Sequence, residues 1–157
     1  MQPKLAITMG DPAGIGPEII VKSLNKKENY EKCRPLVCGD AKVMQLAVEK
    51  MGTAHKINPI KNVSEAKFEF GTIDVYDLDL VNMDEFEFGQ VQVQCGNAAF
   101  QSVKKAIELA LADEVDGTVT APLNKEALNL AGHHYDGHTE IYATFTNTKK
   151  YAMLLAD

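Results

Sequence analysis

The chain has 157 residues, of which 45% are hydrophobic and 24% are charged, and its formal net charge is −6. This composition is typical of a globular domain with a sizeable core. The negative charge argues against nonspecific nucleic-acid binding, which needs a basic face. No apolar run approaches the ~20 residues of a membrane span, and the N-terminus lacks the apolar stretch of a signal peptide. We therefore expect a cytoplasmic protein with no nucleic-acid or membrane partner.

Strand-like and helix-like patterns alternate along the chain. The predicted strands are 4–9, 35–38, 72–78, 116–120 and 151–156, and the predicted helices are 17–25, 41–51, one that Asn97 opens as N-cap, and 124–130. Phe100, Val103, Ile107, Ala110 and Leu111 share one face of the helix after Asn97. This alternation predicts an α/β fold with a mostly parallel sheet flanked by helices.

The three cysteines do not indicate a disulfide framework or a zinc site. Cys33, Cys38 and Cys95 are odd in number, and their spacing fits neither arrangement. We interpret all three as structural residues, with Cys38 in a buried strand.

A glycine-rich turn, Gly-Asp-Pro-Ala-Gly-Ile-Gly-Pro-Glu at 10–18, joins the first strand to the first helix. Its candidate cleft-lining residues are Gly10, Asp11, Gly14 and Gly16. The dinucleotide fingerprint fails because its third glycine position is Ile19, and the phosphate loop fails because no Lys-Ser or Lys-Thr follows. A tight turn without a ligand is the alternative interpretation.

Lys125 follows a strand end in the segment Thr-Ala-Pro-Leu-Asn-Lys at 120–125. A lysine in the first turn of a helix lies at the positive end of the helix dipole, where its charge is unfavourable. An anionic ligand bound there would compensate for this charge. Ligands of open α/β sheets bind beyond the carboxyl ends of the strands, which is where this segment falls. The alternative is a solvated surface lysine.

Three of the four histidines lie in the segment 132–140. His134 and His138 would form a metal pair on a helix, but Gly132 and Gly137 argue against helical geometry. The H-x-E pattern of zinc deaminases begins at His138, but its P-C-x-x-C partner is absent. We instead expect a loop entering a helix at Thr139, where hydroxyl, backbone N–H and imidazole groups bind an oxyanion or phosphate. A loop rich in histidine by chance is the alternative.

Taken together, these segments resemble the 4-hydroxythreonine-4-phosphate dehydrogenase family of vitamin B6 biosynthesis. The matching segments are 7–18, 120–125, 137–140 and 151–156. The resemblance implies a fold similar to isocitrate and isopropylmalate dehydrogenases. It also implies NAD- or NADP-dependent oxidation of 4-phosphooxy-L-threonine, a small phosphorylated hydroxy acid, to a 3-oxo acid that decarboxylates.

The resemblance assigns roles to particular residues. His138 and Thr139 match the substrate-binding pair, Lys125 matches a lysine near the substrate, and Gly10 and Asp11 begin the cleft loop. Asp136 stands where the family commonly has proline.

The resemblance also implies a divalent metal of the zinc, magnesium or cobalt class. Its histidine ligands, and the catalytic residues, are expected beyond Asp157, so we expect no metal ligand in this segment and no activity from it alone. The full-length protein is expected to form a homodimer.

The chain resembles only about the first half of a family member. Its stop directly after the predicted strand 151–156 leads us to expect a piece of a longer protein. We divide it into a first α/β domain at 1–126 and the start of a substrate- and metal-side domain at 127–157.

Two other functions stay open at this point. A related branch of the family acts on 4-phospho-threonate or 4-phospho-erythronate and shares these motifs. A non-catalytic module that binds a phosphorylated ligand is the alternative of a different class, and the reading frame beyond codon 157 would discriminate between module and enzyme.

Overall fold

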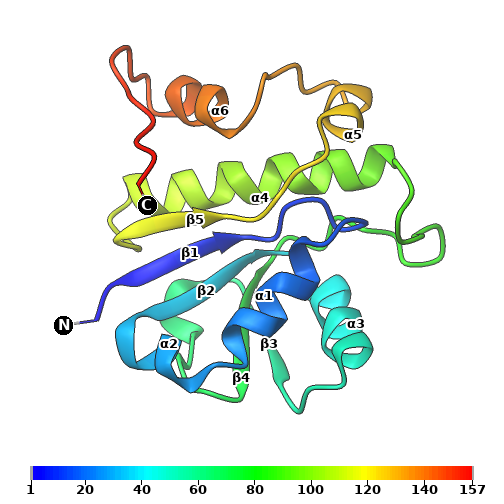
Figure 1. Cartoon of the computed structure of the whole chain (residues 1–157), viewed down its shortest axis with the longest axis vertical. Coiled ribbons are helices and arrows are strands. Elements are labelled where there is room, and N and C mark those ends of the chain that lie inside the picture. The colour runs from blue at the N-terminus through cyan, green and yellow to red at the C-terminus, as the bar shows by residue number, and fades with distance from the viewer. Residues whose placement is uncertain (1, 157) are drawn as a thin grey trace.

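The computed structural model describes residues 2–156, in which a parallel sheet lies between layers of helices (Figure 1). The strands are β1 (Lys4–Thr8), β2 (Arg34–Gly39), β3 (Lys56–Ile60), β4 (Thr72–Asp77) and β5 (Gly117–Thr120). Their order is β3-β4-β2-β1-β5, and every neighbouring pair is parallel. The predicted α/β fold with a mostly parallel sheet is confirmed.

Helices cover both faces of the sheet. They are α1 (Gly16–Leu24), α2 (Lys27–Lys32), α3 (Ala41–Met51), α4 (Val93–Leu111), α5 (Lys125–Leu130) and α6 (His138–Phe145), with a 3₁₀ turn, η1, at Val63–Glu65. α1 and α3 share one core with the sheet and α4 shares another, while α5 and α6 lie beyond α4 (Figure 1).

The central strand β2 shows how the sequence specifies these layers. Val37 points into the core that α1 and α3 share, whereas Leu36 and Cys38 point into the core that α4 covers. All three side chains are fully buried, as expected for a parallel strand covered on both faces. The prediction that Cys38 lies in a buried strand is confirmed.

A third cluster joins α5 and α6 to the outer side of α4. Leu128 of α5 and Ile141 of α6 are fully buried against Phe100, Val103 and Ile107 of α4. Gly96 permits this close packing, because a Cβ there would overlap the backbone of Ala127.

Asp40 fixes the loop that follows β4. One carboxylate oxygen caps α3 by accepting hydrogen bonds from the N–H groups of Lys42 and Val43. The other accepts from Leu80 and Val81. The buried carboxylate thus accepts the hydrogen bonds of four backbone N–H groups, in place of backbone carbonyl oxygens.

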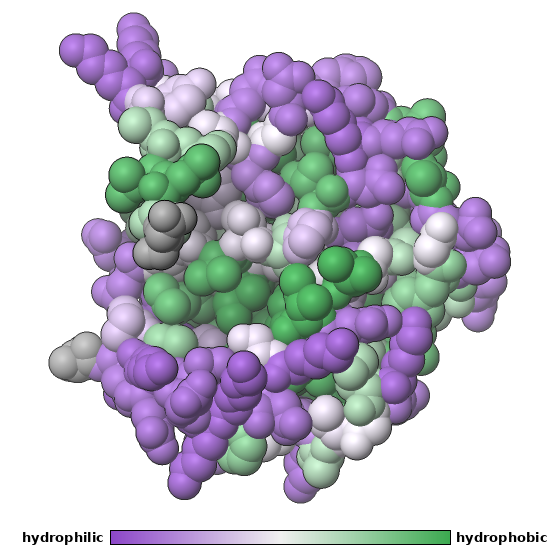
Figure 2. Space-filling model, in the orientation of Figure 1, coloured by the Kyte–Doolittle hydropathy of each residue, from purple (hydrophilic) through white to green (hydrophobic). Residues whose placement is uncertain are grey.

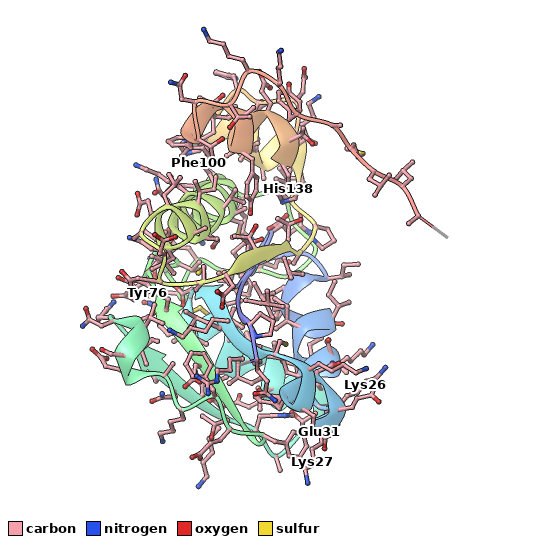
Figure 3. All side chains as sticks on the ribbon, turned by 90° about the vertical axis from the view of Figure 1, so that its left-hand side faces the viewer. Lys26, Lys27, Glu31, Tyr76, Phe100 and His138 are labelled. Atoms are coloured by element: carbon pink, nitrogen blue, oxygen red, sulfur yellow. The ribbon has the colours of Figure 1, made fainter. Side chains whose placement is uncertain are left out.

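The predicted strand at 151–156 is wrong. The segment pairs with no strand of the described chain, and Met153, Leu154 and Leu155 are 73–90% exposed. Figure 3 shows it extending away from the rest of the molecule. An apolar, strand-like sequence forms a strand only where its backbone hydrogen-bonds to a neighbouring strand, and this segment makes no such pairing in the described chain.

The predicted start of the long helix is also wrong. α4 begins at Val93, so Asn97 lies within its second turn, where its carboxamide bonds to His133 instead of capping the helix. Leu111, expected on the buried face, is 61% exposed because it ends the helix.

Two elements escaped prediction. The sequence of α2 has no apolar periodicity that would predict a helix, and none of its residues is buried. β3 contains Pro59, which weakens a strand pattern but is tolerated on an edge strand such as this one. No helix among residues 2–156 is long and apolar enough to cross a membrane.

Candidate functional site

The loops that follow β1 and β5 pack directly on one another at the carboxyl edge of the sheet. The Asp11 N–H donates to the Pro122 carbonyl at 2.9 Å. Gly10 adopts a φ of 72°, and a Cβ at this position would overlap the same carbonyl oxygen. At Gly16 a Cβ would overlap the carbonyl oxygen of Met9. These two glycines are therefore required by contacts within the chain.

The interior of the glycine-rich turn is closed and acidic. Asp11 is buried and accepts a hydrogen bond from the Ala13 N–H at 2.9 Å, and burial raises the pKa of its carboxyl group. Glu18, in the first turn of α1, pairs with Lys50 at 3.0 Å. Two carboxyl groups so close to the turn do not fit a dinucleotide pyrophosphate, so we assign no cofactor contact to it.

A cavity of about 720 Å³ opens at the N-terminus of α6. It is lined by Thr120, Asp136, Gly137, His138, Thr139, Glu140, Tyr151 and Met153. A second cavity of about 330 Å³ adjoins it, since the two share Thr120, His138, Thr139 and Tyr151. We call the two together the α6 pocket. The structure therefore brings the predicted pair His138 and Thr139 to one pocket, whose lining includes no residue of the turn 10–16.

The N-terminus of α6 faces this pocket without a side-chain cap. Gly137 occupies the N-cap position, and no side chain accepts from the first-turn N–H groups there. These N–H groups are hydrogen-bond donors that the helix itself leaves unused. Tyr142 holds α6 on the sheet, because its hydroxyl donates to Thr118 Oγ1 of β5 at 2.8 Å.

His138 contributes a buried nitrogen to the α6 pocket. Its Nε2 atom is buried and has no hydrogen-bond partner among the described residues. Figure 3 places His138 between α6 and the sheet. Burial lowers the pKa of the imidazole, so the ring is neutral at neutral pH. A buried polar atom without a partner is costly, which indicates a site that a ligand or water completes.

Thr8 is the second such case in the described chain. Its Oγ1 atom is buried and unpaired, and the residue stands in register with Thr120 on the neighbouring strand. Residues in register on parallel strands share a face, so Thr8 lies on the same face as the pocket-lining Thr120.

Lys125 lies beside the α6 pocket and contacts one of its lining residues. Its Nζ atom is 3.1 Å from Asp136 Oδ1, and both side chains are exposed. Asn124 fixes the start of α5 by accepting from the Ala127 N–H. On the other side, the Asp136 N–H donates to Glu140 Oε2 at 2.6 Å. The three predicted ligand-binding residues thus lie around one pocket.

The remaining histidines of the segment have other roles. His133 stacks on Phe100 with ring centroids 3.8 Å apart, and its Nε2 pairs with Asn97 Oδ1 at 3.0 Å. His134 is exposed. Among residues 2–156 no three His, Cys, Asp or Glu side chains gather as metal ligands would. The described residues therefore do not fit a metal centre.

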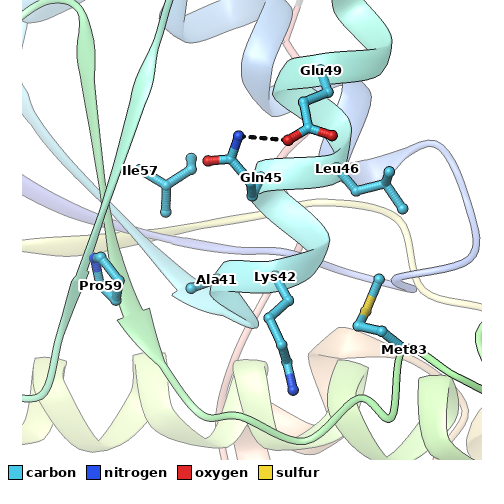
Figure 4. A pocket seen from close by; sticks show the side chains of 8 residues that line it. All are labelled: Ala41, Lys42, Gln45, Leu46, Glu49, Ile57, Pro59 and Met83. Atoms are coloured by element: carbon cyan, nitrogen blue, oxygen red, sulfur yellow. Dashed lines mark hydrogen bonds between the residues drawn. The ribbon is translucent and has the colours of Figure 1, made fainter.

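Two other hollows are less suited to chemistry. One of about 470 Å³ lies between α3 and β3, where Lys42 pairs with Asp79 and Gln45 bonds to Glu49 (Figure 4). Another, of about 290 Å³, lies between α1 and β5 within the apolar surface visible in Figure 2, and no titratable side chain lines it.

Comparison with known proteins identifies the family of this chain. Residues 31–157 match the family described as "Pyridoxal phosphate biosynthetic protein PdxA". The chain belongs to the PdxA family. A relative from Clostridium botulinum, named "Putative D-threonate 4-phosphate dehydrogenase", is 47% identical over 94% of this chain and 44% of its own length.

Solved structures of the PdxA family share the fold described above. A 4-hydroxythreonine-4-phosphate dehydrogenase from Burkholderia phymatum is 48% identical, with a TM-score of 0.92 over 96% of this chain and 45% of its own. The enzyme of that name from Klebsiella pneumoniae is 43% identical, with a TM-score of 0.92 over 100% of this chain and 47% of its own. The chain therefore spans about half the length of the relatives it matches.

Of the residues that line the α6 pocket, the sequence analysis predicted only His138 and Thr139 as ligand-binding. Thr120, Asp136 and Glu140 stood inside recognised motifs, but the spacing alone gave no reason to single them out. Tyr151 was expected in a strand and instead lies on the extended segment that borders the pocket.

Proposed function

We propose that this chain supplies the phosphate-binding half of an NAD- or NADP-dependent dehydrogenase that acts on 4-phosphooxy-L-threonine. The observation that carries the proposal is the α6 pocket of a PdxA-family chain. Its lining includes the uncapped N-terminus of α6, Thr139, and His138, whose buried Nε2 has no hydrogen-bond partner among the described residues. Helix N-termini with free N–H groups bind phosphate well.

Each residue has a distinct task in this proposal. The first-turn N–H groups of α6 and the Thr139 hydroxyl donate to the phosphate oxygens. His138, neutral and half-buried, donates or accepts one hydrogen bond through Nε2 and so fixes the orientation of the substrate. Lys125 adds a positive charge beside the pocket by leaving Asp136 for the ligand.

The chemical step is assigned outside the described residues. When bound, NAD or NADP would accept a hydride from the substrate alcohol, and a divalent metal would polarise the alcohol oxygen. We propose no residue of this chain as a ligand of either group. We also propose that the full-length protein is a cytoplasmic homodimer, that a domain boundary lies at residue 126, and that the turn Gly10–Gly16 forms part of the cleft.

Phosphate binding tests the proposal directly. In Thr139→Val the hydroxyl is replaced by a methyl group of similar size, and we expect the Kd for inorganic phosphate, measured by calorimetry at low ionic strength, to rise about tenfold. Thr144→Val is the matched control, because Thr144 is exposed on the same helix and lines neither cavity. Equal Kd values for the two variants would contradict the assignment of Thr139.

Turnover gives a second test. We expect the purified 157-residue chain to form no reduced nicotinamide from 4-phosphooxy-L-threonine with NAD or NADP and divalent metal. Measurable formation by the chain alone would show that the catalytic residues are present within it.

A second substrate is favoured by a specific observation. Curated relatives about as similar as the solved enzymes carry the name of a D-threonate 4-phosphate dehydrogenase. Both candidate substrates are four-carbon hydroxy acids with a terminal phosphate, so the α6 pocket would hold either by that group. Comparing kcat/KM for the two substrates, in whichever longer protein contains this chain, would assign the activity.

A further inference from the structure

The charges around the α6 pocket are poorly matched to an anionic ligand. Its lining carries two carboxylates, Asp136 and Glu140, and no lysine or arginine. Glu140 turns its carboxylate onto the backbone N–H of Asp136. Asp136 has a 92% exposed side chain that reaches Lys125. Lys125, a cation beside the pocket, is therefore engaged by one of the pocket's own carboxylates.

We propose that Asp136 weakens phosphate binding in the α6 pocket. This rests on the proposed function of the pocket. Asp136 acts in two ways, because it holds the Lys125 ammonium at 3.1 Å and because its own negative charge faces an incoming phosphate. A ligand must draw Lys125 away from Asp136 and accept the remaining repulsion.

The ion pair between Lys125 and Asp136 is weak enough for a phosphate to displace it. An exposed ion pair contributes little to stability, so a doubly charged phosphate displaces it at small cost. A single carboxylate within a few ångströms of a phosphate repels it through water-like surroundings, and salt screens this repulsion. Removing the carboxylate charge should therefore tighten binding by about three- to tenfold at low ionic strength, and by less at high salt.

Asp136→Asn is a clean substitution for this purpose. The backbone N–H that donates to Glu140 is retained, and the exposed side chain keeps its size. Glu126→Gln is the matched control: it removes the same charge from an exposed residue next to Lys125, and Glu126 lines neither cavity of the α6 pocket. Circular dichroism melting curves would show that both variants fold like the parent chain.

The experiment measures the Kd for inorganic phosphate by calorimetry at low and high salt. We expect Asp136→Asn to bind about three- to tenfold more tightly than Glu126→Gln, with the difference shrinking at high salt. In a Lys125→Met background the gain from Asp136→Asn should be smaller, because only the repulsion is then relieved.

Three results would overturn the proposal. Equal binding by Asp136→Asn and Glu126→Gln would show that Asp136 has no influence, with the proposed phosphate pocket left intact. Weaker binding by Asp136→Asn would show that Asp136 instead orients Lys125 toward the ligand. Absence of phosphate binding in every variant, the parent chain included, would overturn the phosphate pocket together with the role of Asp136.

Discussion

Gly10 shows how a single residue joins the two loops at the carboxyl edge of the sheet. Its positive φ and the contact with the Pro122 carbonyl both exclude a side chain. At Gly14, four residues later, a Cβ would meet only ordinary van der Waals neighbours, the nearest of them 3.5 Å away. The glycines of the turn thus differ in what they require.

This difference gives a prediction for the turn. Gly10→Ala should lower the free energy of unfolding by about 3 kcal/mol, because strained backbone and steric overlap add. Gly14→Ala should change it by less than about 1 kcal/mol. Chemical denaturation of both variants measures the two effects, and equal losses would contradict the contact between the loops.

The half-buried imidazole of His138 makes stability depend on pH. Burial lowers its pKa, and that of His133, so below the ordinary histidine pKa of about 6.5 the unfolded chain takes up protons that the folded chain does not. The free energy of unfolding should therefore fall as the pH drops from about 7.5 to about 5.5.

Variants assign this pH dependence to particular residues. In His138→Asn the free energy of unfolding should fall less with decreasing pH than in the parent chain. Since both chains contain the buried Asp11, its contribution cancels in the comparison. His134→Asn, at an exposed ring, is the control. Thermal unfolding across this pH range gives both slopes, and an unchanged slope in His138→Asn would place the protonation elsewhere.

At the scale of elements, the position of α5 depends on the close contact with α4. Gly96 is buried in α4, and a Cβ there would overlap the Ala127 backbone of α5. In an ordinary helix interior, replacing glycine by alanine stabilises the protein by about 1 kcal/mol. Here we expect the opposite sign.

Gly96→Ala should therefore destabilise the chain by about 1–3 kcal/mol, because α5 must move outward. It should also weaken phosphate binding, since α5 carries Lys125. Denaturation and calorimetry on one sample test both effects. A stabilised variant with the phosphate affinity of the parent would contradict the contact.

Elements with a clear apolar pattern or turn signal could be predicted from the sequence, and the others could not. The strands at β1, β2, β4 and β5 and the helix α3, with Gly52 at its end, follow from apolar spacing and a glycine cap. α2 has no buried face, and the apolar segment 151–156 has no neighbour to pair with. Local sequence carries no information about a missing partner.

The same limit applies to the candidate site. His138 and Thr139 could be singled out because a glycine-flanked loop led into a helix. The ion pair between Lys125 and Asp136 could not be predicted, because the two residues come together only after α5 and α6 fold against α4. The role of Asn97 was likewise decided by its contact with His133, 36 residues away.

At the scale of the whole molecule, the parallel sheet places the loops that follow β1 and β5 at the same edge. The turn after β1 packs on the segment after β5, and that segment leads through α5 to the pocket at α6. The chain spans about half the length of its PdxA-family relatives. The central claim is that this half holds the phosphate of the substrate.

Amide NMR spectra of the 157-residue chain during titration with inorganic phosphate at low ionic strength test this claim most directly. We predict saturable shifts at Gly137, His138, Thr139 and Glu140, with smaller shifts at Lys125. No shift at the start of α6, or shifts confined to the turn 10–16, would contradict it.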